Sequence, residues 1–207
     1  MIGTNFYYMD YKNQLILTGQ INDVGSAIMT NVDNSYRTGI ELMAGIKFLK
    51  VFDWNVNITL SRNKIKGYTD YLEDWDNGGL IETQIGKTDI AFSPTVTCNS
   101  VLSFKPGKKL EISLLSNYVG KQYIDNTSSN DRKLDAYFVN NLKFDYQLKQ
   151  NLFKSVKLNL LINNIFNKEY ESNAWVYSYF YNGKRNKMDG YFPQAGTNFL
   201  VSVNVDF

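Results

Sequence analysis

Apolar and polar residues alternate with a period of two over most of this chain. The final segment shows the alternation most clearly, with apolar residues at every second position: Phe199, Val201, Val203, Val205 and Phe207. Ser202, Asn204 and Asp206 lie between them. A period of two places alternate side chains on opposite faces of a β-strand. The segment therefore predicts a strand with one apolar face and one polar face.

Similar alternation predicts further strands, about eight in all, and no segment has the apolar spacing of a helix. In the clearest of them, Trp54, Val56, Ile58 and Leu60 alternate with Asn55, Asn57, Thr59 and Ser61. The predicted strands cover residues 3–18, 32–48, 53–66, 89–104, 109–123, 134–148, 156–170 and 196–207. Each has about 14 residues, whereas strands of soluble sheets usually have about 5 to 6.

The connections between these strands alternate in length. Those at 49–52, 105–108 and 149–155 are short. Longer loops are predicted at 19–30, 67–88, 124–133 and 171–195. In an up-and-down sheet this order puts all the short turns at one end, as in outer-membrane barrels. The fold class predicted is therefore all-β, an antiparallel up-and-down transmembrane β-barrel segment; the alternative is a soluble β-sandwich whose apolar faces meet.

Aromatic residues gather near both ends of the predicted strands, as in the two interfacial girdles of a membrane barrel. At the short-turn end they are Phe48, Phe52, Trp54, Phe104, Tyr146 and Phe207. Toward the long-loop end they are Tyr68, Phe92, Tyr123, Phe138, Tyr170 and Phe199.

Composition excludes several classes of function. The 207 residues carry a net charge of only +2, and no run of Lys or Arg forms a nucleic-acid patch. The chain has no histidine, which removes Ser-His, Cys-His and His-metal chemistry, and we expect neither an enzyme nor a cofactor. Cys98 is the single cysteine, so no intrachain disulfide forms. The sequence also lacks an apolar run long enough for a membrane helix, and its start lacks the pattern of a signal peptide.

The predicted loop at 67–88 is acidic and contains a weak candidate for a metal site. Asp74, Asp76 and Asn77 offer oxygen ligands of the kind that a hard cation such as calcium prefers. Their spacing departs from that of an EF-hand loop. The alternative is an ordinary solvated outer loop.

The predicted loop at 171–195 is the favoured ligand contact. It carries the rings of Trp175, Tyr177, Tyr179 and Tyr181 beside the guanidinium of Arg185. Such rings stack on sugars or flat chelates, and the cation suits an anionic ligand. Trp75 of the 67–88 loop joins this candidate set. The alternative is that these rings serve as interfacial anchors or in loop packing.

Several segments, taken in order, resemble the carboxy-terminal barrel of TonB-dependent outer-membrane receptors, especially those of Bacteroidota type. They are Phe6–Leu15, Asn34–Leu42, Phe92–Pro94, Tyr118–Thr127, Asn163–Tyr170 and the ending Tyr191–Phe207. The resemblance implies an outer-membrane protein that imports a scarce nutrient, such as an iron chelate, cobalamin or a glycan. The competing functional hypothesis is a soluble carbohydrate-binding module that uses the Trp175–Tyr181 segment.

The resemblance also carries expectations about what surrounds this chain. Receptors of this kind have about 22 barrel strands and a plug domain. We therefore expect residues 1–207 to be the carboxy-terminal part of the barrel, without the plug and without the amino-terminal part that contacts TonB. The expected partners are outer-membrane lipid and the barrel-assembly machinery, for which Phe207 resembles the recognition signal.

Overall fold

The computed structural model describes residues 1–22, 24, 26–148 and 153–206, and they form an all-β structure. In this part of the chain no helix is long and apolar enough to cross a membrane. Phe207, the expected assembly signal, lies outside the described residues. The strands are β1 (Ile2–Ile21), β2 (Ala27–Phe48), β3 (Phe52–Asp74), β4 (Leu80–Asp89), β5 (Val96–Phe104), β6 (Leu110–Val119), β7 (Gln122–Tyr123), β8 (Lys133–Leu134), β9 (Tyr137–Gln147), β10 (Ser155–Asn163), β11 (Glu171–Tyr181), β12 (Lys184–Pro193) and β13 (Asn198–Asp206).

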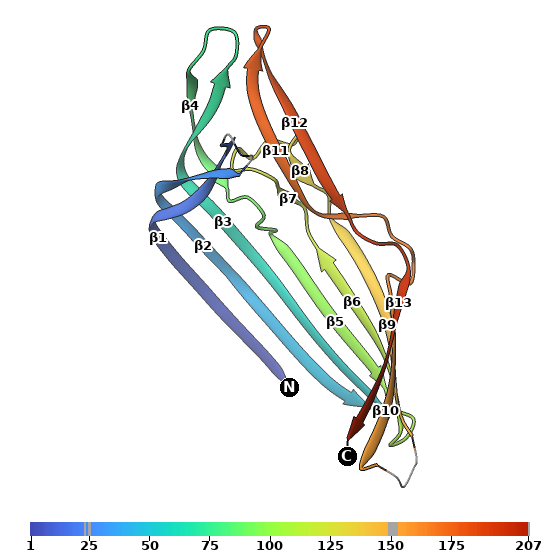
Figure 1. Ribbon diagram of the computed structural model, residues 1–207. Helices are drawn as coiled ribbons and strands as arrows, with labels where there is room; N and C mark the ends of the chain where they lie inside the picture. Colours follow the sequence, from blue (N-terminus) through green and yellow to red (C-terminus); the bar gives the residue numbers. More distant parts are fainter. Residues whose placement is uncertain (23, 25, 149–152, 207) are drawn as a thin grey trace.

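Eight of these strands form one curved wall in the order β1-β2-β3-β5-β6-β9-β10-β13 (Figure 1). Every neighbouring pair in this wall is antiparallel. The prediction of about eight antiparallel up-and-down strands is confirmed. Within the described residues β1 and β13 form the two edges and do not pair with each other, so the wall is open.

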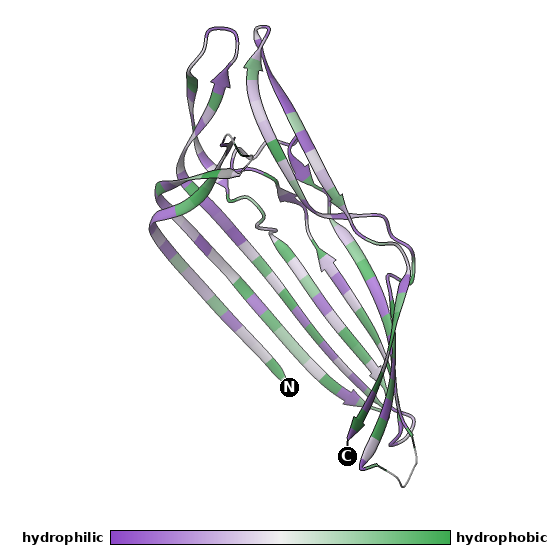
Figure 2. Ribbon diagram, in the orientation of Figure 1, coloured by the Kyte–Doolittle hydropathy of each residue, from purple (hydrophilic) through white to green (hydrophobic). Residues whose placement is uncertain are grey.

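Hydrophobic and hydrophilic residues alternate along the wall strands (Figure 2), and the strand register brings the residues of one row opposite one another on neighbouring strands. Leu42, Ile58 and Cys98 are directly opposite one another on β2, β3 and β5. On the other face polar side chains join neighbouring strands: Asn159 donates to the Ser202 hydroxyl at 3.1 Å, and Ser103 and Ser113 share a hydrogen bond of 2.8 Å. The polar row of each strand therefore continues across the sheet.

No second sheet covers the apolar face of the wall in the described part of the chain. Phe6 and Phe199 are each 71% exposed on this face, and Trp54 is 44% exposed. A soluble protein rarely leaves so continuous an apolar surface in water. The sandwich alternative required a second packed sheet and is wrong.

An aromatic row crosses the apolar face at the short-turn end. The rings of Phe48 and Phe52 stack with centroids 5.1 Å apart, and Phe104 follows 5.0 Å from Phe52. Tyr8 and Tyr36 stack 6.0 Å apart nearer the long-hairpin end of the same face. The predicted girdle at the short turns is thus present on three adjacent strands.

The predicted loops at 67–88 and 171–195 are instead β-hairpins. β3 continues to Asp74 and returns as β4, and β11 returns as β12 through Asn182 and Gly183. These two residues have φ angles of 54° and 72°, as the turn of a two-residue hairpin requires. Wall strands also differ from the expected length, because β1 to β3 have 20 to 23 residues whereas β5 and β10 have 9.

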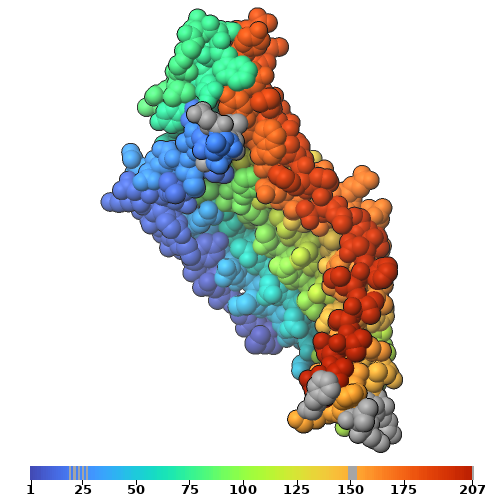
Figure 3. Space-filling model, in the orientation of Figure 1, coloured from blue at the N-terminus to red at the C-terminus, as the bar shows by residue number. Residues whose placement is uncertain are grey.

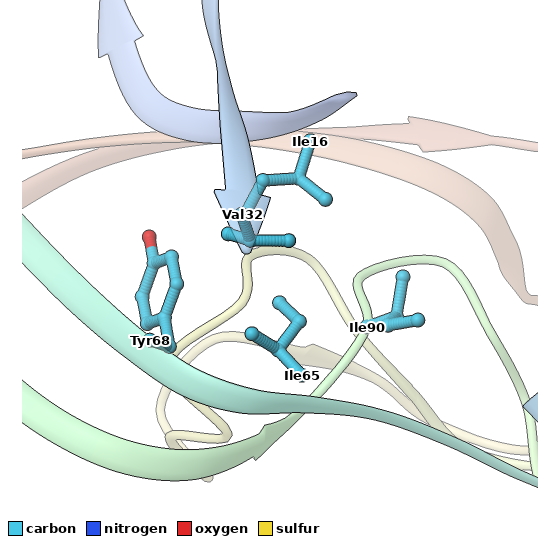
Figure 4. Close-up of a cluster of buried hydrophobic side chains, with 5 residues drawn as sticks. All are labelled: Ile16, Val32, Ile65, Tyr68 and Ile90. Atoms are coloured by element: carbon cyan, nitrogen blue, oxygen red, sulfur yellow. The ribbon is translucent and has the colours of Figure 1, made fainter. Parts of the chain in front are cut away.

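The two hairpins lean together beyond the outer end of the wall (Figures 1 and 3). β11 pairs in parallel with the end of β3, where Tyr179 lies opposite Glu73. At the base of the β3–β4 hairpin, Ile16, Val32, Ile65, Tyr68 and Ile90 form a buried apolar cluster (Figure 4). The expectation that Tyr68 belongs to an interfacial girdle is wrong, because its ring is only 2% exposed and its hydroxyl faces the Thr18 carbonyl at 3.3 Å.

Substitution at the middle of the apolar face tests whether this face meets lipid. Ile58 lies about midway along the apolar row of β3, and Asn57 is its neighbour on the polar face. We expect Ile58→Arg to lower the free energy of unfolding in lipid vesicles by about 2–4 kcal/mol, because a cation is costly at the bilayer midplane. Urea titration of the vesicle-inserted protein measures this. Asn57→Arg adds the same charge on the polar face and is expected to be nearly neutral; equal costs would refute the assignment of the faces.

Candidate functional site

Three of the five predicted ligand rings come together where the tips of the β3–β4 and β11–β12 hairpins meet. Trp75 stacks on Tyr179 with ring centroids 4.1 Å apart. Tyr177 lies 6.2 Å from Trp75 and 5.8 Å from Tyr179. Two predicted loops about a hundred residues apart thus contribute to one aromatic cluster, which we call the tip cluster: Trp75, Tyr177 and Tyr179.

Hydrogen bonds fix the tip cluster between the hairpins. The Trp75 amide donates to the carbonyl of Phe180 at 2.9 Å, next to the parallel pairing of β3 and β11. The hydroxyl of Tyr177 donates to the carboxylate of Glu73. Burial, together with the hydrogen bond and the charge of Glu73, raises the pKa of the Tyr177 phenol to about 12. The neutral phenol is therefore the form that this contact stabilises.

The carboxylates predicted as metal ligands make hydrogen bonds at the tips. Asp74 accepts the amides of Asp76 and Asn77 at 3.0 and 3.1 Å, and the Asn77 side chain at 3.1 Å. These bonds hold the pKa of Asp74 below its usual value, the Asn77 side chain most strongly. Asp76 accepts the amides of Asn182 and Gly183 at 2.8 and 2.9 Å, so it joins the turns of the two hairpins.

A metal ion at this place lacks further support from the geometry. In the part of the chain that the structure describes, no group of three or more His, Cys, Asp or Glu side chains is placed to hold one. The predicted set Asp74, Asp76 and Asn77 stays a prediction.

Charged pairs below the tips attach the β11–β12 hairpin to the wall. Arg185 forms an ion pair with Asp70, whose side chain is only 6% exposed. Deeper still, Arg132 pairs with Asp125 at 3.1 Å, and both side chains are nearly buried. Its guanidinium also donates to Thr127 at 2.7 Å and to Ser178 on β11 at 3.2 Å. Burial lowers the pKa of Arg132, and the Asp125 carboxylate opposes that shift.

Sequence reasoning missed the residues that form this buried polar layer. Asn126 is 1% exposed, accepts the amide of Ala91 at 2.8 Å and donates to the carbonyl of Leu17 at 2.7 Å. Asp125, Asn126 and Arg132 come from a segment whose composition predicts only a polar loop. Their partners are up to 109 positions away, so no local spacing indicates the contacts. The Asn182–Gly183 pair was the one usable signal, because Asn-Gly between alternating residues predicts a hairpin.

Three of the predicted ligand residues keep much of their surface open. Trp75 is 51% exposed, Trp175 46% and Tyr181 54%. Trp175 lies on β11 with its indole over Gly190 of β12, whereas Tyr181 lies next to the hairpin turn. These exposed rings are available for stacking on a ligand, and their role as ligand contacts stays a prediction.

A polar cavity of about 280 Å³ lies beside the β11–β12 hairpin. Its lining includes Arg132, Arg185 and Lys187, together with Ser129 and Ser178. Each of the three cations already has a carboxylate partner, since Lys187 pairs with Asp189 at 2.6 Å. These three ion pairs, of which only Lys187–Asp189 lies within the hairpin, therefore neutralise the cations of the cavity.

The fold, with its two projecting hairpins, is that of a wall segment of a transmembrane-type β-barrel. Comparison with known proteins identifies its family. Residues 1–165 match the family model described as TonB dependent receptor-like, beta-barrel. A search of curated proteins finds no match. The chain belongs to the family of TonB-dependent receptors, as the resemblance of its segments implied.

Solved structures of two uptake receptors and of a copper transporter share the fold at low sequence identity. The siderophore receptor PiuA from Acinetobacter baumannii superposes on 99% of this chain with a TM-score of 0.68 and 16% identity. The ferric yersiniabactin uptake receptor FyuA from Yersinia pestis covers 100% of it, with a TM-score of 0.62 and 16% identity. The copper transporter OprC also covers 100%, with a TM-score of 0.64 and 17% identity. The chain spans 26%, 27% and 28% of their lengths, respectively.

The Tyr177–Glu73 contact predicts a pH dependence of the hairpin junction. The pKa of the phenol rises from 10.0 to about 12 in the folded protein, so the contact adds stability below pH 10. That stability is lost as the pH rises through 12, because burial disfavours the charged tyrosinate and the Glu73 carboxylate repels it. The difference in tyrosinate absorbance between the native protein and Tyr177→Phe should titrate near pH 12. A difference that titrates near pH 10 would contradict the contact, and the exposed Tyr181→Phe is the control.

Removal of the Asp76 carboxylate should loosen the two tips from each other. Asp76→Ala deletes both acceptors of the Asn182 and Gly183 amides. Since a hydrogen bond to a charged group is worth about 1.5–3 kcal/mol, these amides should exchange hydrogen about tenfold to a hundredfold faster. Hydrogen-exchange mass spectrometry of the 176–187 segment measures the rate. Asp135→Ala, whose side chain is 85% exposed, is the matched control and should change nothing there.

Proposed function

We propose that this chain is the membrane wall and outer-loop part of an outer-membrane receptor that takes up a scarce nutrient in a TonB-dependent manner. The observation that carries the proposal is the uncovered apolar face of an eight-stranded antiparallel wall in a chain of the TonB-dependent receptor family. Lipid is the environment that suits such a face, and the polar opposite face then lines the barrel interior. The proposed location is therefore the outer membrane.

An iron chelate is the ligand class that we favour. PiuA is a siderophore receptor and FyuA takes up ferric yersiniabactin, whereas OprC is a copper transporter. Flat, partly anionic chelates suit exposed aromatic rings near a guanidinium. The proposed contacts are the open rings Trp75, Trp175 and Tyr181, with Tyr177, Tyr179 and Arg185 holding the surface that presents them.

Other features of the proposal come from the family resemblance. Contact with TonB belongs to a part of the receptor outside this chain, and Phe207 is proposed as the signal for the barrel-assembly machinery. The Bacteroidota type is proposed from the ordered segments between Phe6 and Phe207. Because the matched family consists of receptors, a transport function is favoured over an enzymatic one.

Membrane insertion is the first test of this function. The receptor that carries this chain should float with lipid vesicles in a density gradient and should resist extraction by carbonate. It should also migrate differently on gels before and after heating, as folded barrels do. A folded protein that stays in the aqueous fraction without detergent would overturn the proposal.

Ligand binding is the second test, with Trp175→Ala as the informative change. Quenching of tryptophan fluorescence by ferric catecholates, ferric hydroxamates, cobalamin, cupric ion and oligosaccharides identifies the ligand class. With the ligand that binds, Trp175→Ala should weaken affinity about tenfold, since an aromatic stacking contact is worth about 1–2 kcal/mol. Phe166→Ala is the matched control, because Phe166 is an exposed ring (73%) outside both hairpins. An unchanged affinity in Trp175→Ala would remove this residue from the site.

A further inference from the structure

The outward row of β3 changes from apolar to basic after Leu60. Arg62, Lys64 and Lys66 continue the row that begins at Trp54, since side chains of a strand alternate between faces. The residues between them, Asn63 and Ile65, are 7% and 0% exposed on the inner side. The basic side chains therefore project from the same face as the apolar belt.

Neighbouring strands add to this basic row. Lys87 of β4 lies over the ring of Tyr36 at 5.3 Å, and Lys66 lies over the same ring at 5.8 Å. Lys12 of β1 is opposite Asn34 of β2, two residues from Tyr36 in the same row. We call the set Lys12, Arg62, Lys64, Lys66 and Lys87 the basic collar.

Only part of the positive charge of the basic collar is neutralised. Lys66 pairs with Asp10 at 2.9 Å and Lys64 with Asp89 at 2.7 Å. Arg62, Lys12 and Lys87 have no carboxylate partner among the described residues. The collar thus keeps an excess of three positive charges, five cations against two carboxylates.

The distance along the barrel axis from the aromatic row to the basic collar matches the thickness of the apolar band of an outer-membrane barrel. Ten residues separate Phe52 of the aromatic row from Arg62, which is about 34 Å along the strand at about 3.4 Å per residue. With the strand tilt of about 35–45° usual in such barrels, the rise along the membrane normal is about 25 Å. The apolar band of an outer-membrane barrel is about 25 Å tall. The collar therefore lies in the headgroup layer at the end where the long hairpins project.

We propose that the basic collar binds the phosphate groups of lipid headgroups in the membrane leaflet on the hairpin side. A guanidinium and several ammonium groups form charge-assisted hydrogen bonds with phosphate oxygens. Long lysine side chains at a membrane surface keep their apolar stems against apolar surface while their charges reach the headgroups. Tyr8 and Tyr36 place amphipathic rings at the same level, where interfacial aromatic residues are enriched.

The collar faces away from the surfaces that a transported nutrient would reach. It lies on the opposite side of β3 from the inner residues Asn63 and Ile65. The tip cluster is about ten residues further along β3, beyond Tyr68. A lipid phosphate, not a dissolved anion in the barrel, is thus the ligand that this position favours. The inference rests on the membrane placement proposed above.

The test compares two variants of equal charge change in the receptor that carries this chain. The collar variant is R62Q/K64Q/K66Q/K87Q. The control variant, K105Q/K109Q/K143Q/K157Q, removes four cations that line a cavity at the short-turn end of the wall. Native mass spectrometry of protein extracted in mild detergent measures the retention of lipid A, a phosphorylated glycolipid, and of neutral phosphatidylcholine.

We expect the native receptor and the control variant to retain lipid A in preference to phosphatidylcholine. In the collar variant the ratio of retained lipid A to retained phosphatidylcholine should be about tenfold lower, which corresponds to about 1.4 kcal/mol. Excess inorganic phosphate should not remove the preference, because the lipid is also held by the apolar belt. Equal preference in the collar variant and the native receptor, or full displacement by inorganic phosphate, would overturn the proposal.

Membrane insertion is measured separately, so that failure of the two proposals can be told apart. If the native receptor enters neutral vesicles but shows no preference for the phosphorylated lipid, the collar proposal fails and the proposed function stands. If the native receptor does not enter vesicles of any composition, the proposed function fails. Should the collar variant fail to insert, Arg62→Gln carries the test, because Arg62 has no ion-pair partner in the described residues and its loss breaks none.

Discussion

The structure depends on one constraint, which is that a backbone amide or carbonyl in lipid must find its partner inside the protein. The antiparallel ladder meets this need for every wall strand from β2 to β10, each of which has a neighbour on both sides. The same ladder sorts side chains into an apolar face with Ile58 and its row and a polar face with Asn57 and its row. In the proposed placement these faces meet lipid and the barrel interior. β1 and β13 each have one neighbour in the described residues, which suits a wall that continues in a larger barrel.

Beyond the headgroup layer water can satisfy the backbone, and the chain no longer needs a continuous ladder. There β3 and β4 part from the wall as a hairpin, and β11 pairs with only two residues of β3. Side chains hold this outer layer: the buried Arg132–Asp125 pair, the Arg185–Asp70 pair and the side-chain amide of Asn126. Separating the partners of a buried pair leaves an uncompensated charge, which is costly. The segments that carry the two partners should therefore pack against each other or separate together.

The wall could be predicted from the sequence because its signal is local. The alternation from Trp54 to Leu60 can be recognised without any knowledge of the partner strands. The hairpins were missed because their stability comes from contacts such as Tyr177 with Glu73, which are 104 positions apart. For the same reason the sequence selected Trp75, Tyr177 and Tyr179 by composition but could not show that they stack on one another. Asn182–Gly183 was a local signal that would have identified one hairpin.

One strand shows how membrane and outer layer are coupled. From its start, the outward row of β3 carries the aromatic girdle at Phe52, the lipid belt through Leu60 and the basic collar from Arg62. Its inward row changes from polar residues that line the interior to Ile65, which packs in the buried cluster under the hairpins. The strand continues without a break to the residues that pair with β11. With the proposed membrane placement, the girdle and the collar hold β3 at the two membrane surfaces. They then also set the height of Trp75 and of the exposed rings of β11 above the membrane.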